Sequence, residues 1–484
     1  MSKKYYISTS IPYVNAAPHI GHALEFVQAD VLARYHREKG DDVFFLTGTD
    51  ENALKNVQAA EKAGVTTEKW VEEQAEIFKK LVKALSISND DFIRTSVENR
   101  LKMGAEKLWL SCKDGDIYKK QYSGLYCVGC EEFKTAKELV DEHCPDHLNQ
   151  EIQKISEENY FFKLSNYQKQ LEEIIESDQV KIIPETRKNE ILSFIKSGLE
   201  DFSVSRSIER AKNWGIKVPK DETQIMYVWI DALSNYISAL DYAENGEKFQ
   251  KYWLNVDESN HLIGKNIIRF HAVYWLAFLL SAGIRLPSKI LVHGFFNING
   301  QKMSKSIGNV VDPLEVITKY GVDATRYFLL SEIPSGEDGD FSFEKFEARY
   351  NGNLANGLGN YTARVLTLAE KVGVLEEIKK ESYISNAVEE TINSVEDSII
   401  SFKLHEALFA IWKLITFGDK YINEHKPWET NDKTVIYNAT YILENVAKLL
   451  KSFLPDSANK ILDAIDNTNG KLVTKKIAPL FPRI

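Results

Sequence analysis

Residues 11–22 read IPYVNAAPHIGH, and they lie between an apolar run at residues 5–7 and a long helical pattern at residues 23–39. Asn15 and Pro18 disfavour regular structure, so the chain is predicted to turn here and then to enter a helix. A strand that leads through a turn into a helix N-terminus forms an anion site, because backbone amides and the positive end of the helix dipole face the ligand. The stretch therefore predicts a nucleotide-binding α/β fold.

The predicted helix start carries two histidines around a glycine. His19 and His22 are three residues apart, so one helical face carries both imidazoles. Gly21 has no side chain and would let a flat ring approach the backbone. Two imidazoles, a glycine and a helix start suit a triphosphate and its base, whereas the alternative interpretation is a turn with two surface histidines.

The strand and the helix are followed by a second strand. This strand is predicted at residues 43–46 and ends at TGTDE, residues 47–51. Strand, helix and strand together predict a βαβ unit, whose parallel sheet binds ligands at the carboxyl ends of its strands. Asp50 is therefore predicted at that edge, although an aspartate before the helix predicted at residues 54–62 could also be its N-cap.

Two lysines lie in a later loop. The sequence KMSKS, residues 302–306, is flanked by glycines and follows an apolar strand predicted at residues 290–293. Lys302 and Lys305 of this loop are candidate partners for an anionic ligand.

An insert interrupts the α/β pattern with a cluster of metal-ligand residues. Cys127-Val-Gly-Cys130 and Cys144-Pro-Asp-His147 each place two soft ligands in a tight turn. Four such ligands complete a tetrahedral zinc site, which has no open coordination position and is therefore structural. His143 could replace His147, but the spacing favours His147.

The α/β pattern resumes at residues 225–230, IMYVWI, which are predicted to form a buried strand of the parallel sheet that ends at Asp231. The residues that follow at strand-end and helix spacing are Trp229, Ala232, Leu233 and Tyr236.

A further strand end, HLIG at residues 261–264, leads into a helix predicted at residues 267–282. Ile267, His271 and Trp275 are spaced four apart and share one face of it. A histidine in such a stripe is usually a hydrogen-bonded core residue, and the alternative is contact with a ligand.

Helical periodicity dominates the C-terminal third of the chain. A polar linker is predicted at residues 334–340, and residues 343–465 show helical periodicity broken by short turns, without strand signals. This pattern predicts a helix bundle. In it, Pro427 fixes the backbone ahead of Trp428, so the indole is predicted at a helix start.

Composition limits the classes of protein that are compatible with this chain. The 484 residues are enough for two or three domains, and the net charge of −10 does not indicate nucleic-acid binding, so an RNA partner would have to meet a local basic surface. No apolar run approaches a membrane span and the N-terminus lacks a signal sequence, so we expect a cytoplasmic protein. Three of the four cysteines are clustered, which is typical of a metal site in a reducing compartment, and Cys112 is expected to be a core thiol.

Eight ordered segments resemble the methionyl-tRNA synthetase family of class I aminoacyl-tRNA synthetases, over essentially the whole chain. They are IPYVNAAPHIGH (11–22), TGTDE (47–51), YCVGC (126–130) with CPDH (144–147), YVWIDAL (227–233), HLIGK (261–265) with IIRFHAVYW (267–275), GQKMSKSIGN (300–309), LGNYTAR (358–364) and KPW (426–428). The pair HIGH and KMSKS, in this order, carries the class signature.

The resemblance implies a Rossmann-type α/β parallel sheet with an inserted zinc-binding connective domain and a C-terminal all-α helix bundle. The implied domains are the catalytic domain at residues 1–115 and 223–334, the insert with its zinc knuckle at 116–222, and the anticodon-binding bundle at 335–484. The implied reaction is ATP-dependent activation of L-methionine to methionyl-adenylate, followed by transfer to the 3′ end of tRNA(Met), including initiator tRNA. The implied cofactors are ATP with Mg²⁺ and one structural Zn²⁺. No membrane partner is implied, and without an appended C-terminal dimerisation domain we expect a monomer.

The resemblance also implies a role for individual residues. The ATP site would comprise His19, Gly21, His22, Gly264 and Lys305, of which His19, His22 and Lys305 act in catalysis together with Lys302. The methionine site would comprise Ile11, Tyr13, Asp50, Trp229, Ala232, Leu233, Tyr236, Ile267 and His271, with Asp50 on the ammonium group and aromatic walls around the thioether. The CAU anticodon would be read by Asn360, Arg364 and Trp428, for which the alternative is a buried tryptophan beside a surface asparagine and arginine.

The chain departs from the family pattern near the expected ATP site. Asn52 and Ala53 stand where the family usually has His-Gly, and Asn266 replaces the usual aspartate after Gly-Lys. The alternatives to methionine activation are another class I specificity and a tRNA-binding scaffold without catalysis. The isoleucyl, leucyl and valyl enzymes carry a much larger insert, a cysteinyl enzyme has zinc ligands in its catalytic pocket, and intact HIGH and KMSKS segments argue against a scaffold.

Overall fold

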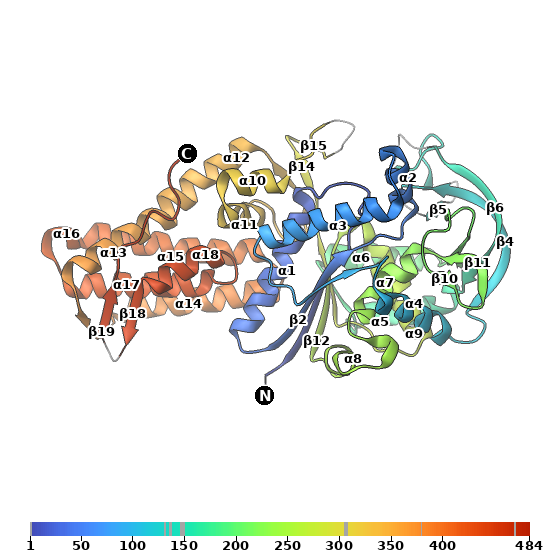
Figure 1. The fold of residues 1–484 in the computed structure, drawn as a ribbon. Coiled ribbons are helices and arrows are strands. Elements are labelled where there is room, and N and C mark those ends of the chain that lie inside the picture. The colour runs from blue at the N-terminus through green and yellow to red at the C-terminus, as the bar shows by residue number, and fades with distance from the viewer. Residues whose placement is uncertain are drawn as a thin grey trace. The chain divides into compact units, whose positions relative to one another are not determined.

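A six-stranded sheet forms the centre of the first of two units in this chain (Figure 1). The computed structural model describes residues 2–129, 132–134, 138–145, 151–303, 308–378, 380–468 and 471–484. The first unit comprises Met1–Pro18, Gly40–Lys83 and Ser88–Val292, and the second comprises His19–Lys39, Ala84–Ile87 and His293–Ile484.

The strands of the central sheet follow the order β3-β2-β1-β12-β13-β7. Their bounds are Lys4–Thr9 (β1), Asp42–Thr49 (β2), Asp91–Arg94 (β3), Lys181–Ile183 (β7), Glu258–Gly264 (β12) and Lys289–His293 (β13). β1 pairs in parallel with both β2 and β12, so that Ile7 lies opposite Phe45 and Asn260. Tyr5, Tyr6 and Ile7 are all buried, which is typical of parallel strands. The predicted parallel sheet and its strands at residues 5–8, 43–46 and 290–293 are thus confirmed.

The first unit contains several helices, and α2 lies where residues 54–62 predict a helix. They are α2 (Leu54–Ala63), α3 (Thr67–Ala84), α4 (Asn99–Ser111), α7 (Val228–Ser238), α8 (Glu247–Phe249) and α9 (Leu276–Ser281), with π-helical turns at Gln250–Leu254 and Phe270–Trp275 and 3-10 turns at Tyr242–Glu244 and Lys265–Ile267. In α3 the buried residues Val71, Ala75, Phe78 and Val82 recur every three or four positions, which is the spacing of one helical face. The helix predicted at residues 267–282 is confirmed, with a π-helical segment in its first half.

The strand predicted at residues 225–230 is wrong in its second half. β11 (Asp221–Met226) ends at Met226, and α7 begins at Val228, so the residues expected at a strand end lie on a helix. β11 also pairs antiparallel within a separate sheet, β10-β11-β9, rather than with the parallel sheet. Every residue of α7 is buried, so the segment has no polar face that would distinguish a helix from a buried strand.

The insert expected at residues 116–222 contains both strands and helices. β4 (Ile117–Cys127) and β6 (Gln153–Phe162) form a long antiparallel pair in a sheet of order β5-β4-β6-β8 (Figure 1). The remaining elements are β5 (Glu132–Lys134), a 3-10 turn (Leu164–Tyr167), α5 (Gln168–Glu176), α6 (Glu185–Lys196), β8 (Phe202–Ser203), β9 (Ser205–Ser207) and β10 (Lys217–Val218). β7, from the same segment, pairs in parallel with β13 and so belongs to the central sheet.

Helices form most of the second unit. They are α1 (Ile20–Glu38), α10 (Pro313–Tyr320), α11 (Val322–Ser331), α12 (Phe343–Arg349), a π-helical segment (Tyr350–Gly359), α13 (Asn360–Val372), α14 (Ser382–Ile400), α15 (Leu404–His425), α16 (Pro427–Thr430), α17 (Lys433–Leu450) and α18 (Pro455–Asp463). α14 packs on α15, and α17 packs on both α13 and α15, so the predicted helix bundle is confirmed (Figure 1).

Short strands add two small sheets to the second unit. One consists of β14 (Phe296–Ile298), β15 (Gln301–Lys302) and β16 (Gly339–Phe341). The other consists of β17 (Leu375–Glu376), β18 (Ile465–Thr468) and β19 (Lys471–Thr474), which corrects the expectation of a C-terminal region without strands. Within the described ranges, no helix combines the length and the apolar character that crossing a membrane requires.

Candidate active site

Helix α1 begins with a capping arrangement made by the two histidines of the HIGH segment. His19 is the N-cap, and its Nδ1 accepts a hydrogen bond from the Gly21 amide at 3.2 Å. The His22 Nδ1 accepts from the His19 amide at 3.1 Å, and the two imidazoles stack with 3.8 Å between ring centroids. Because Nδ1 is an acceptor in both rings, each neutral imidazole carries its proton on Nε2. The predicted helix start is confirmed.

Gly21 is required by the packing of this turn. A Cβ atom at this position would lie 3.0 Å from Cε1 of His19, so any larger residue would displace the imidazole. The imidazole of His19 itself lies against this glycine, and the approach of a ligand ring to its backbone stays a prediction. The same Cβ would lie 3.9 Å from Cε of Met303, which places the start of the KMSKS loop beside the HIGH turn.

The KMSKS segment is described in part. The backbone of Lys302 belongs to β15, which pairs antiparallel with β14. Residues 304–307 lie outside the described residues, and with them the predicted catalytic residue Lys305.

The residues predicted for methionine gather in the first unit. One hydrophobic cluster contains Ile11, Trp229, Ala232, Leu233 and Tyr236, and Tyr13 and Ile267 pack against it. Tyr13 forms a β-bridge with Asp50, and its ring meets the Trp229 indole edge-on at a centroid distance of 6.2 Å. The structure thus brings together side chains from the first loop, α7 and the turn before the π-helical segment.

His271 is a buried, neutral member of this group. Its Nδ1 donates to the Ile267 carbonyl at 2.9 Å, which leaves Nε2 to accept the hydroxyl of Tyr236 at 2.7 Å. Burial lowers the pKa of His271 to about 4, against the hydrogen bond to Ile267, which raises it. The centroid of this neutral imidazole lies 6.3 Å from that of the Trp229 ring, so these two predicted site residues are aromatic and uncharged.

Asp50 lies directly after β2, at the carboxyl end of a central strand. It is buried, and its backbone amide donates to the Pro12 carbonyl at 2.9 Å. The alternative role as the N-cap of α2 is wrong, because the N-cap position is Ala53. Gly264 also ends a strand of this sheet, β12, and is buried.

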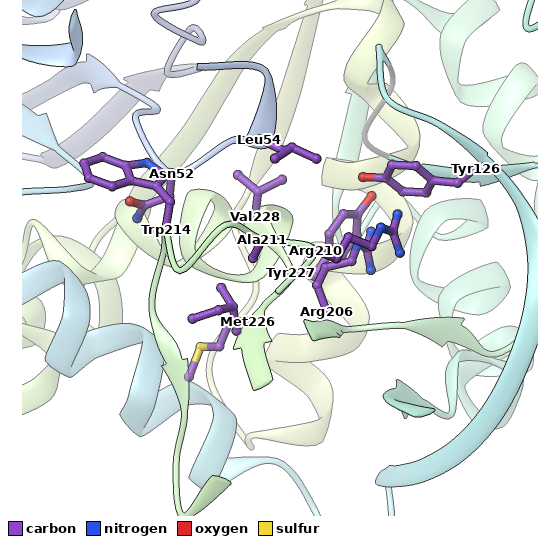
Figure 2. A pocket seen from close by; sticks show the side chains of 11 residues that line it. Asn52, Leu54, Tyr126, Arg206, Arg210, Ala211, Trp214, Met226, Tyr227 and Val228 are labelled. Atoms are coloured by element: carbon purple, nitrogen blue, oxygen red, sulfur yellow. The ribbon is translucent and has the colours of Figure 1, made fainter. Parts of the chain in front are cut away.

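A pocket of about 360 Å³, including its open mouth, lies next to these residues (Figure 2). Asn52 and Val228 line one side of it, and Tyr126, Arg206 and Arg210 line another. The guanidinium carbon of Arg210 lies 4.0 Å from the ring centroid of Tyr126. The two arginines could not be predicted as pocket residues, because they lie in the insert outside every recognised segment.

Two further residues around the site were missed. Phe270 stacks on Trp229 with 3.7 Å between ring centroids, and Asp231 lies buried in the first turn of α7. Both residues belong to segments that resemble the family and are adjacent in sequence to predicted site residues. That adjacency could have indicated them as site residues.

Two of the four predicted zinc ligands are described. Cys127 and Cys144 are buried, whereas Cys130 and His147 lie outside the described residues. Among the residues that are described, no group of three or more metal-ligating side chains comes together. The alternative ligand His143 has its Nδ1 2.7 Å from the Asp141 carbonyl.

The predicted anticodon residues lie together in the second unit. The guanidinium of Arg364 lies 5.3 Å from the Trp428 ring centroid and is bonded to Asp419 at 2.6 Å and to Asn423 at 2.7 Å. Trp428 is 41% exposed, so the alternative of a buried tryptophan is wrong. Asn360 is exposed and lies on α13, one turn before Arg364.

Two protein-family models match the chain. The family "tRNA synthetases class I (M)" matches residues 5–155 and 147–366, and the family "Anticodon-binding domain of tRNA ligase" matches residues 381–480. The chain belongs to the class I methionyl-tRNA synthetases.

Individual relatives are similar over almost the full chain. The methionine–tRNA ligase of Caldanaerobacter subterraneus subsp. tengcongensis is 43% identical over 97% of this chain and 75% of its own length. That of Brucella suis is 40% identical over 96% of this chain and 92% of its own length. The structure of Mycobacterium tuberculosis methionyl-tRNA synthetase in complex with methionyl-adenylate superposes with a TM-score of 0.93 at 38% identity, and covers 99% of this chain and 100% of that one.

The activity follows from this membership. The chain is a ligase that activates L-methionine with ATP and transfers it to tRNA.

Proposed function

We propose that the clustered residues of the first unit form the methionine site of this ligase. A thioether is polarizable and nearly apolar, so it is recognised better by ring faces than by hydrogen-bond donors. Tyr13, Trp229 and the neutral His271 supply such faces, and the hydrogen bond from Tyr236 to His271 fixes the imidazole. The remaining walls would be Ile11, Ala232, Leu233 and Ile267.

The Asp50 carboxylate would receive the ammonium group of methionine. A charged ammonium that leaves water needs an ionised partner, and Asp50 lies at the sheet edge beside Tyr13. With the amino group held there, the carboxylate of methionine can attack the α-phosphate of ATP in line. The products of this step are methionyl-adenylate and pyrophosphate.

The HIGH and KMSKS segments would stabilise the negative charge that develops on the phosphates. Phosphoryl transfer needs positioning and charge neutralisation more than a covalent nucleophile. The Nδ1 hydrogen bonds of His19 and His22 place a donor on Nε2 of each ring, which is the form that can donate to a phosphate oxygen. Lys305, with support from Lys302, would add positive charge, and Gly264 would let the nucleotide approach the backbone. Mg²⁺ would arrive with ATP.

A structural zinc ion would be held by Cys127, Cys130, Cys144 and His147. The burial of Cys127 and Cys144 fits this donor set, since the ligands of a closed zinc site are shielded from water. Bound zinc would stabilise a small module that has few apolar residues of its own.

The anticodon of tRNA(Met) would be read by Asn360, Arg364 and Trp428, of which the exposed indole can stack on an unpaired base.

The experiment that tests the methionine site is ATP–pyrophosphate exchange with each of the twenty amino acids. We expect exchange with methionine alone, because the uncharged aromatic walls suit a thioether. Equal exchange with leucine or cysteine would contradict the assignment of these residues. A Trp229→Ala variant should raise the KM for methionine and leave the KM for ATP unchanged.

A further inference from the structure

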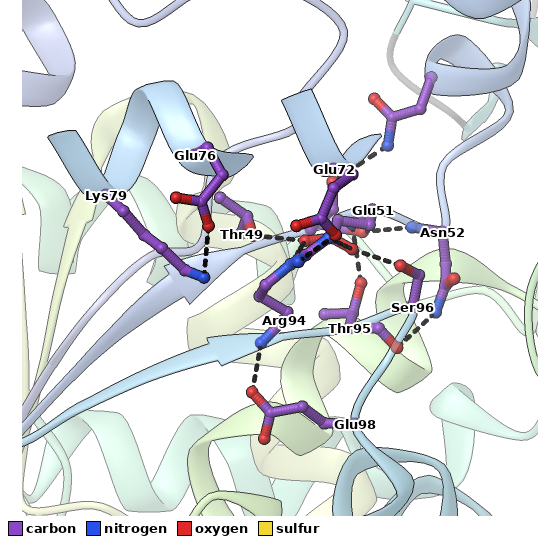
Figure 3. A network of polar contacts seen from close by, with 12 residues as sticks. Thr49, Glu51, Asn52, Glu72, Glu76, Lys79, Arg94, Thr95, Ser96 and Glu98 are labelled. Atoms are coloured by element: carbon purple, nitrogen blue, oxygen red, sulfur yellow. Dashed lines mark hydrogen bonds and ion pairs between the residues drawn. The ribbon is translucent and has the colours of Figure 1, made fainter. Parts of the chain in front are cut away.

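The segment that carries Asp50 is fixed by a buried polar network around its neighbour Glu51 (Figure 3). The Glu51 side chain is 0% exposed, and its carboxylate accepts hydrogen bonds from Thr49, Arg94 and Ser96. Its backbone amide donates to the Thr95 hydroxyl at 2.7 Å, and its carbonyl accepts from the Trp214 indole at 2.8 Å. These bonds hold both the side chain and the backbone of Glu51, and so limit the movement of its neighbours Asp50 and Asn52.

Asn52 connects Asp50 with a second buried carboxyl group. The backbone amide of Asn52 donates to Oδ1 of Asp50 at 3.2 Å. Its side-chain Nδ2 donates to Oδ2 of Asp231 at 2.6 Å and to the Thr95 carbonyl at 3.2 Å. Both hydrogens of the amide are thus used, so the orientation of the side chain is determined.

Within the described part of the chain, no cation pairs with the buried Asp231 carboxyl. It is 1% exposed, and among the described residues its Oδ1 has no hydrogen-bond partner. It lies in the turn of α7 between Trp229 and Ala232, both of them predicted walls of the methionine site. Burying a carboxyl whose partner is a neutral amide lowers the stability of the fold. Its position beside the proposed site therefore suggests a functional role.

We propose that Asn52 and Asp231 are a positioning pair that holds the Asp50 carboxylate for the ammonium group of methionine. This inference rests on the proposed role of Asp50. Asp231 fixes the Asn52 side chain, and the Asn52 backbone amide then fixes one oxygen of Asp50. The link between the two carboxyl groups is thus made by a residue that cannot change its charge.

The pair gives the methionine site a dependence on pH. Burial raises the pKa of the Asp231 carboxyl to about 7, against the hydrogen bond from Asn52, which lowers it. The ionised carboxylate is the stronger acceptor for the Asn52 amide, so the pair holds Asp50 better above this pH. Among the described residues, the charged groups near the pair include Asp50, behind Asn52, and Arg206 and Arg210, which line the pocket together with Asn52. They also include the ion pair of Glu51 with Arg94 beside Asn52.

The test measures KM and kcat for methionine-dependent ATP–pyrophosphate exchange between pH 6 and pH 8.5. Loss of a hydrogen bond to a charged group corresponds to a factor of about ten or more, so Asn52→Ala should raise the KM for methionine by about that factor and leave the KM for ATP unchanged. In the wild-type chain the KM for methionine should fall as the pH rises through about 7, the pKa of Asp231. The isosteric Asp231→Asn variant should remove this pH dependence.

Exchanging the two side chains separates positioning from general stability. Asn52→Asp alone places two carboxyl groups in contact and should raise the KM for methionine further. The double variant N52D/D231N restores one amide–carboxylate hydrogen bond with the roles reversed, and it should recover most of the lost affinity. Recovery by the exchange is a result that a merely structural role would not produce.

Asn438→Ala is the matched control for the loss of a buried amide. Asn438 is fully buried in the helix bundle, where its Nδ2 donates to the Tyr421 hydroxyl at 3.2 Å. This variant should lose thermal stability and keep the wild-type KM for methionine. An unchanged KM for methionine in both Asn52→Ala and Asp231→Asn would overturn the pair, as would a parallel rise in the KM values for methionine and ATP. If Asp50→Ala also left methionine activation unchanged, the proposed role of Asp50 would fail, and not the pair alone.

Discussion

At the scale of single residues, the proposed methionine site and the core behind it contain histidines that burial keeps neutral. His261 accepts the Trp275 indole N–H on Nε2 at 3.1 Å, and its Nδ1 is 2.7 Å from the Ser8 hydroxyl. Burial, with a smaller effect from the neighbouring His271, lowers the pKa of His261 well below its ordinary value. Both imidazoles would lose a hydrogen-bond acceptor on protonation, so the core behind the site is arranged for the uncharged form.

This burial predicts a pH dependence of stability. The pKa of His271 is about 4 in the folded chain and about 6.5 in an unfolded one, so the unfolded state binds the proton more tightly. The stabilisation is present in full above pH 6.5 and is lost as the pH falls toward 4, and for His271 it amounts to about 3 kcal/mol. Thermal unfolding measured between pH 7 and pH 4 should show this loss, and a His271→Gln variant should show a flatter profile. A melting temperature that is constant over this range in the wild-type chain would contradict the prediction.

At the scale of elements, helix α1 is tied into the second unit by one buried arginine. Arg326 of α11 is fully buried and meets Oδ2 of Asp30 in α1 at 2.7 Å. Its other donors reach the backbone carbonyls of Leu85, Ser452 and Phe453. Because α1 begins at the HIGH turn, this contact also fixes the helix whose N-terminus carries His19 and His22.

Arg326→Met should therefore destabilise the second unit strongly. Removal of one partner of a buried ion pair costs about 3–5 kcal/mol, and the loss should lie at the lower end of this range because Arg34 also contacts Oδ2 of Asp30, at 2.7 Å. Arg349→Met is the matched control, because Arg349 makes a partly exposed pair with Glu332, and exposed pairs contribute at most about 1 kcal/mol. Chemical denaturation of both variants measures the difference. Equal losses in the two variants would show that the Asp30 carboxylate is stabilised without Arg326.

The predicted zinc knuckle is a second element that can be tested directly. We expect one zinc ion per chain by elemental analysis, and Cys144→Ala should release it and lower the thermal stability of the insert. Cys112→Ala is the control: burial raises the pKa of the Cys112 thiol to about 12, as expected for a core thiol, and this variant should keep the metal. Wild-type protein that contains no zinc when it is purified without chelator would refute the site. Zinc that is kept by His147→Ala and lost by His143→Ala would move the fourth ligand to His143.

Some elements could be predicted from the sequence and others could not, for physical reasons. The HIGH turn was predictable because Pro18 and the helical pattern after it limit where a helix can start, and Asp50 because β2 is a clear apolar run. Helix α7 was not, since all its residues are buried and a short apolar run is compatible with strand or helix. The role of Asp231 could not be predicted either, because its partner Asn52 is 179 residues away in the sequence.

At the scale of the whole molecule, the predicted functional residues are divided between the two units. The predicted methionine residues all lie in the first unit, whereas the HIGH turn, the described part of the KMSKS loop and the anticodon residues lie in the second. The second unit is discontinuous in sequence, because α1 belongs to it and follows β1 and precedes β2 of the first unit along the chain.

The activation and transfer steps of the reaction can be separated by one variant in the second unit. Amino-acid activation proceeds without tRNA, whereas transfer requires it, so a residue that acts only on the anticodon should affect transfer alone. Stacking of a base on an aromatic ring is worth about 1–3 kcal/mol, so Trp428→Ala should lower the kcat/KM for tRNA methionylation by about fivefold to 150-fold. ATP–pyrophosphate exchange should stay near the wild-type rate.

Phe409→Ala provides the control for the loss of an exposed ring from the same helical unit. Phe409 is 63% exposed on α15 and belongs to none of the predicted tRNA contacts, so this variant should methionylate tRNA normally. If exchange and methionylation fell together in Trp428→Ala, the indole would act through packing. If neither fell, the anticodon would be read by other residues. Because Arg364 lies against the Trp428 ring and is held by Asp419, Arg364→Ala should reproduce the selective loss of methionylation if the two side chains act as one recognition surface.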